Sequence, residues 1–280
     1  MNDRLEKRLA DIVLYGSVAA VLVFFYIPIA TLILFSFTES RFLSWPIPGF
    51  SLRWYGELLA DRSFWSALGN SAVLAVLATL FATVLGLAGA FAWSRYRFRF
   101  QWGFRVLTFA PLLFPQLLLG VVMLLWFSVL AGWLNMSPGL WSAVIGHVVY
   151  IVPFCIVIIS VQMQGYDDTL DYAAEDAGAT RWQILREVTL PLLWPGILSA
   201  ATFAFLLSWG NFYITYSLSG SARTLPTFVF SGIAVGSSPI YPALATLTFV
   251  PALVLIFAVD RLRRRADRKR ALARAAAEAG

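Results

Sequence analysis

The feature that most constrains this chain is a series of six apolar runs, each long enough to cross a bilayer. A hydrocarbon core about 30 Å thick needs about 20 residues of helix, so an apolar run of this length indicates a membrane-spanning helix. The runs lie at about residues 12–37, 68–93, 106–133, 140–162, 192–218 and 241–259. Apolar residues make up 60% of the chain and charged residues 13%. We therefore predict an all-α integral membrane protein with six transmembrane helices.

The basic residues between the runs predict the orientation of the chain. Six spans place both termini on one side of the membrane, and 17 of the 21 lysines and arginines fall on that side. Because cytoplasmic loops carry the excess of basic residues, both termini are predicted to be cytoplasmic, as in a multi-pass protein of a bacterial inner membrane. The basic tail is expected to meet membrane lipid, and nucleic-acid binding is not predicted.

Four regions follow from this topology. They are a cytoplasmic leader with the first transmembrane helix (1–37), a periplasmic loop (38–67), a five-helix core (68–262) and a basic cytoplasmic tail (263–280). The loop is expected to be extended, with a short helix from about Ser51. In the second span, small residues recur every fourth position and predict close contact with another helix: Ala78, Ala82, Gly86 and Ala90.

The spans lack the groups that couple transport to ions or that catalyse reactions. No Asp, Glu, Lys or Arg lies near the middle of any span, and His147 is the only histidine. A lone histidine is interpreted as a structural hydrogen bonder. The chain has no phosphate-binding loop, catalytic set or metal-ligand cluster. We therefore predict no catalytic residue, metal site or cofactor in this chain, and either a separate energy source or a passive role.

A hydrophilic segment between the fourth and fifth spans, residues 165–191, is here called the coupling segment. It carries six acidic residues between Asp167 and Glu187. A capping box from Asp168 to Asp171 predicts a helix through Ala177, which Gly178 ends in a left-handed conformation. Thr180 and Gln183 predict the cap of a second helix, which meets the fifth span at Pro191. Residues alone leave two interpretations open: a protein-docking element, or a solvated loop.

The spacing within this segment resembles that of a known family. Ala173, Ala174, Gly178, Val188, Leu190 and Pro191 match the signature of permease subunits of type I bacterial ATP-binding-cassette (ABC) importers, although Tyr172 stands where that family has Glu. The run from Gly146 to Phe230 is similar to permeases of the spermidine/putrescine group. The resemblance implies that the segment contacts an ATPase through these residues: Asp171, Tyr172, Ala173, Ala174, Glu175, Asp176, Gly178, Leu190 and Pro191.

The same resemblance implies the partners of the chain. A permease of this family pairs with a second, related permease, two ATPase subunits that bind ATP and Mg, and a periplasmic substrate-binding protein. The chain itself would be a non-catalytic subunit. A passive channel or a membrane scaffold is the competing hypothesis, which would account for the spans but not for the signature.

Candidates for the translocation path gather in the third and fifth spans. They are Gln116, Ser208, Trp209, Asn211, Tyr213 and Tyr216. Polar groups at this depth are either glue between helices or part of a path wall. A polyamine or related small organic solute is favoured by the resemblance, although no carboxylate stands near Asn211 to balance an ammonium group. Iron(III), an anion or an amino-acid-like solute remain alternatives.

Overall fold

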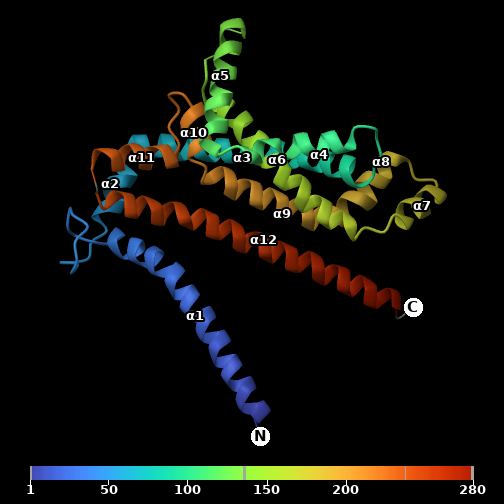
Figure 1. Cartoon of the computed structure of the whole chain (residues 1–280), viewed down its shortest axis with the longest axis horizontal. Coiled ribbons are helices and arrows are strands. Elements are labelled where there is room, and N and C mark those ends of the chain that lie inside the picture. Colours follow the sequence, from blue (N-terminus) through green and yellow to red (C-terminus); the bar gives the residue numbers. More distant parts are fainter. Residues whose placement is uncertain (1, 135–136, 237, 279–280) are drawn as a thin grey trace. The chain divides into compact units, whose positions relative to one another are not determined.

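The computed structural model describes residues 2–134, 137–236 and 238–278. Over this part of the chain the structure is all-helical and has no strands, which confirms the predicted fold class at that level. The chain divides into two compact units, Met1–Arg62 with Val229–Pro251, and Ser63–Phe228 with Ala252–Gly280. Figure 1 shows the helices in chain order, and each unit is described by itself below.

Five helical segments among the described residues are long and apolar enough to cross a membrane. They are Lys7–Ser36, Arg62–Ser94, Gln116–Trp133, Leu140–Gln164 and Arg181–Trp209. Two shorter apolar stretches, Leu225–Ala234 and Ile240–Phe249, follow them. The predicted sixth span starts in the second of these stretches, so the count of six stays a prediction.

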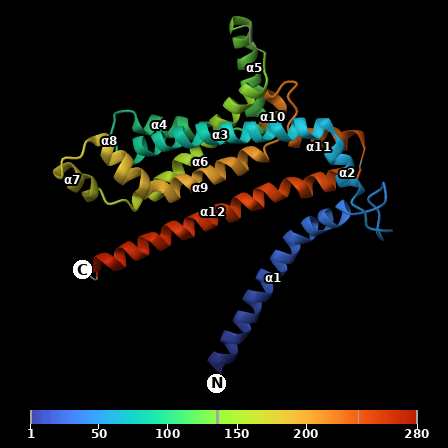
Figure 2. The same cartoon turned by 180° about the vertical axis from the view of Figure 1, so that it is seen from behind.

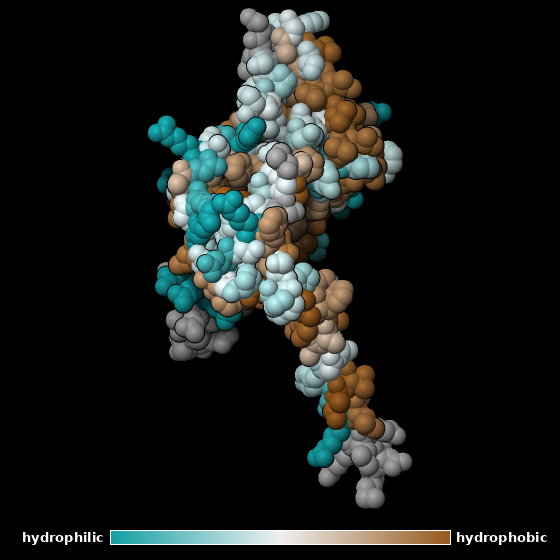
Figure 3. Space-filling view, turned by 90° about the vertical axis from the view of Figure 1, so that its left-hand side faces the viewer, coloured by the Kyte–Doolittle hydropathy of each residue, from teal (hydrophilic) through white to brown (hydrophobic). Residues whose placement is uncertain are grey.

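The first unit contains the N-terminal helix α1 (Asn2–Ser36) and the short helix α2 (Arg53–Ala60). Side chains along α1 are exposed, Phe24 and Phe25 among them, and Figure 3 shows hydrophobic residues over much of this helix. A membrane-spanning helix that faces lipid has this pattern. The predicted loop helix is confirmed as α2, which is anchored by Trp54, whose indole donates to the Thr38 carbonyl at 2.7 Å.

The second unit is built on three long helices that lie side by side in both Figure 1 and Figure 2: α3 (Arg62–Ser94), α6 (Leu140–Gln164) and α9 (Leu190–Trp209). The small-residue face of α3 is fully buried, as predicted. A Cβ on Gly86 would lie 2.3 Å from the Cβ of Cys155 on α6. The two backbones therefore approach each other as closely as a glycine allows.

The third and fifth spans are not the continuous helices that were predicted. The third is divided into α4 (Gln101–Phe109), the 3₁₀ turn η1 (Ala110–Leu113) and α5 (Gln116–Leu134). Pro115 explains this break, because it disfavours helical geometry at Phe114, which is extended at φ −90° and ψ 136°.

In the fifth span the helix stops at Trp209, and α10 (Tyr213–Leu218) begins after three intervening residues. Gly210 ends α9. The Asn211 side chain accepts a hydrogen bond from the Ile214 N–H at 3.0 Å and so caps α10. The predicted start at about Leu192 lies two residues from the first residue of α9, Leu190, and helical structure already begins at Arg181.

The last part of the chain holds a helix that the sequence analysis missed. The segment between the predicted fifth and sixth spans contains α11 (Leu225–Val235). The Thr227 hydroxyl accepts from the Thr224 N–H at 2.9 Å at its start, and the Ser71 hydroxyl of α3 accepts from the Leu225 N–H at 2.8 Å. The final helix, α12 (Ile240–Glu278), continues well past the predicted end at Val259.

Candidate functional site

The first half of the coupling segment is a short helix, α7 (Thr169–Asp176). Its predicted cap was wrong, because Asp168 has helical geometry and no capping bond from its side chain. Asp167 takes that place and accepts from the Thr169 hydroxyl at 2.7 Å and from its N–H at 3.0 Å. These two bonds lower the pKa of Asp167. The carboxylate is therefore held in its charged form beside the positive end of the helix.

Gly178 ends α7 as predicted, with φ +84°. Its N–H donates to the Glu175 carbonyl at 2.9 Å, and the Ala179 N–H donates to the Ala174 carbonyl at 3.0 Å. A side chain at this position would meet no atom within 4 Å. Glycine is therefore required by the left-handed backbone and not by crowding.

The second half of the segment is joined to the membrane helix without a break. Thr180 and Gln183 form the predicted capping box at the start of α8 (Arg181–Gln183). A π-helical segment, η2 (Ile184–Thr189), then leads directly into α9, and Pro191 lies in the first turn of α9. The predicted second helix therefore begins at its capping box and runs into the fifth span without a break. The helical run is continuous from Arg181 to Trp209.

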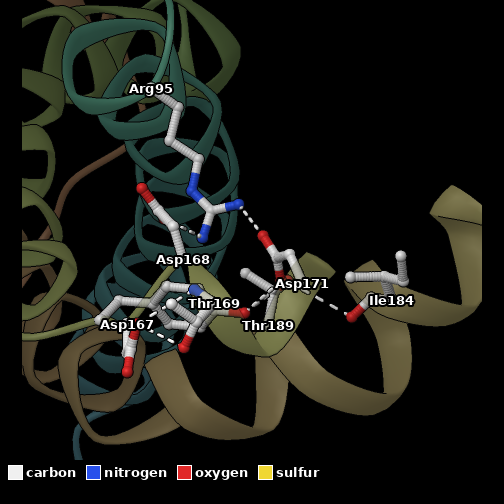
Figure 4. Close-up of polar contacts among 8 residues, drawn as sticks. Arg95, Asp167, Asp168, Thr169, Asp171, Ile184 and Thr189 are labelled. Carbon is white, nitrogen blue, oxygen red and sulfur yellow. Dashed lines mark hydrogen bonds and ion pairs between the residues drawn. The ribbon is translucent and has the colours of Figure 1, made fainter. Parts of the chain in front are cut away.

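A cluster of charged and aromatic side chains fixes α7 against the end of α3. The Arg95 guanidinium donates to the Asp171 carboxylate and lies 3.2 Å from that of Asp168. Figure 4 shows the arginine reaching down from α3 to both aspartates. Tyr166, which follows α6, donates its hydroxyl to the other oxygen of Asp171, and the arginine lies 4.5 Å from the centre of its ring.

The electrostatics of this cluster favour the paired form. Burial alone would lower the pKa of Arg95, but hydrogen bonds to Asp171 and Tyr166, together with the charges of Asp171 and Asp168, raise it overall. Burial and the hydrogen bond to Asp171 raise the pKa of Tyr166. Both groups therefore keep their protons near neutral pH and continue to donate to Asp171.

The predicted contact residues divide into an inner and an outer set. Asp171, Ala174 and Leu190 are half-buried, and Asp171 is already paired within the chain. The outer set is exposed: Tyr172, Ala173, Glu175, Asp176, Gly178 and Pro191. The exposed ring of Trp182 on α8, 67% accessible, lies in the same segment as that of Tyr172, 66% accessible. Large exposed aromatic rings beside acids are typical of a protein-docking surface.

The sequence analysis missed Arg95 and Tyr166 as parts of this site. Arg95 was used only to predict topology, and it lies 76 positions from Asp171. No spacing rule connects residues so far apart. Beside the cluster lies a groove of about 630 Å³. It is lined by α3, α7, α8, η2 and the start of α9, with Phe91, Glu175, Arg181 and Leu185 among the lining residues.

The path candidates surround the break between α9 and α10. His147 on α6 is fully buried, with Nδ1 at 2.8 Å from the Ser208 hydroxyl and Nε2 at 2.8 Å from that of Thr215. Ser208 is on α9 and Thr215 on α10, so one imidazole bridges both sides of the break. The prediction of a structural hydrogen bonder is confirmed by these contacts.

The remaining candidates differ in exposure. The Asn211 amide donates to the Gln116 side chain on α5 at 3.4 Å, so two predicted path residues meet although 95 positions separate them. Trp209 stacks on Phe205, with ring centres 5.5 Å apart. Tyr213 and Tyr216 are about half exposed. Ser208 thus joins helices, whereas the role of the two tyrosines in a path stays a prediction.

Comparison with known proteins gives a consistent set of matches. Residues 82–271 match the family described as "Binding-protein-dependent transport system inner membrane component". The chain is 33% identical over 251 residues to the spermidine/putrescine transport system permease protein PotC of Escherichia coli (strain K12), covering 89% of this chain and 93% of PotC. It is 36% identical over 253 residues to the putrescine transport system permease protein PotI of the same organism, covering 88% and 89%.

A more distant relative and a solved structure extend the comparison. The putative 2-aminoethylphosphonate transport system permease protein PhnV of Salmonella typhimurium is 30% identical over 257 residues, covering 91% of this chain and 96% of PhnV. A bacterial ABC transporter involved in the import of the acidic polysaccharide alginate has a similar fold. Its TM-score is 0.71 at 17% identity, covering 94% of this chain and 99% of that chain.

Proposed function

Because the chain belongs to the family of binding-protein-dependent transport system inner membrane components, we propose that it forms one half of the translocation path of an ATP-driven importer for a small solute that carries a primary amine. The chain is a permease subunit of an ABC importer related to polyamine permeases. Its partners would be a second permease, two ATPase subunits that hold ATP and Mg, and a periplasmic binding protein. Both termini and the coupling segment would face the cytoplasm.

The observation that carries this proposal is that one side of α7 is held within the chain while its other side is exposed. The Arg95–Asp171 pair holds its inner side, which leaves Tyr172, Ala173, Glu175 and Asp176 outward. Small residues allow an ATPase surface to approach, and the acids attract basic residues on it. Tyr172, at the position of the family Glu, would contribute a large ring instead of a charge. Glu175 supplies the nearest exposed carboxylate, because Asp171 is already engaged.

The continuous rod from α8 to α9 supports the coupling mechanism. When ATP closes the ATPase subunits, displacement of the docked segment would move α8 and α9 together, because η2 joins these two helices without a loop. The break at residues 210–212 would then absorb the motion. We infer that this break, bridged by His147, is where rigid movement becomes a change in the path.

The substrate class follows from the chemistry that the relatives share. Their names specify spermidine, putrescine and 2-aminoethylphosphonate. All three compounds carry a primary amine, which is protonated at neutral pH. The accessible rings of Tyr213 and Tyr216 could attract an ammonium group at about 0.5–2 kcal/mol each. A polyamine is favoured over the aminophosphonate because the two polyamine relatives are the more similar ones.

Co-purification and transport test this function. A tagged full-length chain should bring down an ATPase and a second permease from a detergent extract. Proteoliposomes that contain this complex and its binding protein should take up labelled putrescine or spermidine. Uptake should require ATP on the side of the membrane that faces the ATPase subunits. Flux that is independent of ATP would refute the importer and favour a passive channel. ATP-dependent uptake of 2-aminoethylphosphonate instead would keep the importer and change its substrate.

A further inference from the structure

The end of α3, the loop that follows it and α4 form a segment of unusual composition, here called the basic connection. Residues 94–109 include four arginines and no acidic residue, and aromatic residues alternate with the first three arginines. Arg97, Arg99, Phe100 and Trp102 are all exposed. The connection lies at the end of a membrane-spanning helix, where aromatic and basic side chains meet lipid headgroups.

Most of this positive charge is uncompensated. Arg95 is paired with Asp168 and Asp171, but among the described residues no carboxylate forms an ion pair with Arg97, Arg99 or Arg105. The Arg105 guanidinium lies 4.8 Å from the centre of the Trp93 ring. This contact orients the arginine at the end of α3 and leaves its charge available for an anion.

An apolar cleft lies along α4, the helix that carries Arg105. It has a volume of about 490 Å³ and lies between α3, α4 with η1, and α6, and its lining includes Ala92, Phe104, Leu107 and Val152. Thr108 is the only polar side chain in the lining. The rings of Phe98 and Phe104 lie 5.9 Å apart, so the cleft adjoins the basic connection.

We propose that this site binds one anionic phospholipid, with an acyl chain in the cleft and its phosphate near Arg97, Arg99 and Arg105. The charge is the argument for an anionic lipid, and the apolar lining is the argument for a lipid over a free anion. A zwitterionic lipid would gain less, because its ammonium group meets no acid in this connection. The proposal goes beyond the transport function and does not depend on which solute is imported.

Lipid titration of the purified transporter tests the headgroup site. The complex in detergent is titrated with phosphatidylglycerol or phosphatidylcholine, and bound lipid is counted by native mass spectrometry. The Arg97→Gln/Arg99→Gln/Arg105→Gln variant should bind phosphatidylglycerol at least about tenfold more weakly, since each basic residue contributes about fivefold. The control is Arg62→Gln/Arg223→Gln, which removes exposed arginines near the other end of α3 and should bind like the wild type. Equal affinity of the triple variant and the wild type would overturn the proposal.

Two further experiments test whether the cleft binds an acyl chain and whether the arginines instead bind a protein partner. Ala92→Phe narrows the cleft and should weaken binding of a long-chain phosphatidylglycerol while leaving the weaker binding of its dihexanoyl analogue unchanged. Equal loss of both would refute a chain-binding cleft. If the triple arginine variant keeps its lipid affinity but no longer co-purifies with the ATPase, the surface belongs to that protein and the lipid site is wrong.

Discussion

Arg95 at the end of α3 and Asp171 on α7 form an ion pair within one chain, with side chains only 24% and 18% accessible. The pair links a membrane helix directly to the segment predicted to meet the ATPase. Because both groups are shielded from solvent, the interaction is screened less than one at the surface. It therefore determines where α7 lies.

We expect Asp171→Asn to uncouple ATP hydrolysis from substrate. The change removes the charge that holds Arg95, and hydrogen bonds to charged groups contribute about 1.5–3 kcal/mol. ATPase stimulation by the loaded binding protein should fall by about tenfold or more in proteoliposomes. Asp176→Asn on the same helix separates positioning from docking, because Asp176 is exposed and lies outside the ion pair. This change should weaken co-purification of the ATPase without displacing α7. Full stimulation in Asp171→Asn would show that the pair does not position α7.

Gly178→Val should also abolish coupling while leaving membrane insertion intact. A β-branched residue is strained at φ +84°, at a cost of about 1–2 kcal/mol. Since a Cβ meets open space there, Gly178→Asn should retain much of the activity, because asparagine tolerates this conformation. Substrate-stimulated ATP hydrolysis distinguishes the two. Equal activity of the valine variant and the wild type would contradict a role for the turn.

Tyr166 should ionise above the ordinary tyrosine pKa of about 10. Its folded pKa is raised, so its bond to Asp171 contributes stability below pH 10 and loses that contribution as pH rises through the folded value. The difference between the ultraviolet titrations of wild type and Tyr166→Phe isolates this group. If this difference shows that Tyr166 titrates at or below pH 10, its hydrogen bond to Asp171 would be contradicted.

Gly86→Ala should destabilise the protein by about 1–3 kcal/mol, because the added Cβ would meet the backbone-proximal Cβ of Cys155. Gly69→Ala is a matched control on the same helix, since no atom lies within 4 Å of its new Cβ. The control should be neutral or slightly stabilising. Thermal unfolding in detergent measures both. A similar midpoint for the two variants would show that α3 and α6 are not in close contact.

His147→Leu should lower the unfolding midpoint and impair transport, because it removes the imidazole partner of the Ser208 hydroxyl. The Thr215 hydroxyl still donates to the Asn211 carbonyl at 2.8 Å. An unsatisfied buried group costs about 1–3 kcal/mol. Adding Ser208→Ala should recover part of the loss if the bridge is the cause, since one unsatisfied group is then removed. Additive losses would indicate that the two residues act independently.

Much of the helical content could be predicted from local pattern. Long apolar runs are sufficient to indicate membrane helices, and the small-residue face of α3 correctly predicted close packing. Gly178 and the Thr180–Gln183 box were predicted correctly because turns and caps depend on a few neighbouring residues. The breaks at Phe114 and Gly210 were missed, although Pro115 and the Gly210–Asn211 pair were visible signals. The mean hydropathy of a long apolar run does not change at such a break, so hydropathy alone does not reveal it.

The sequence by itself determined that this chain is a helical membrane protein and, through the spacing from Ala173 to Pro191, which family it resembles. Tertiary structure decided which acids are free: Asp171 is taken by Arg95 and Tyr166, whereas Glu175 and Asp176 remain exposed. It also brought His147 to both sides of the helix break, and Gln116 to Asn211. The physical reason is range. The length of an apolar run and the conformation of the backbone are local properties of the sequence. A hydrogen bond between residues 60 to 100 positions apart forms only once the helices have packed.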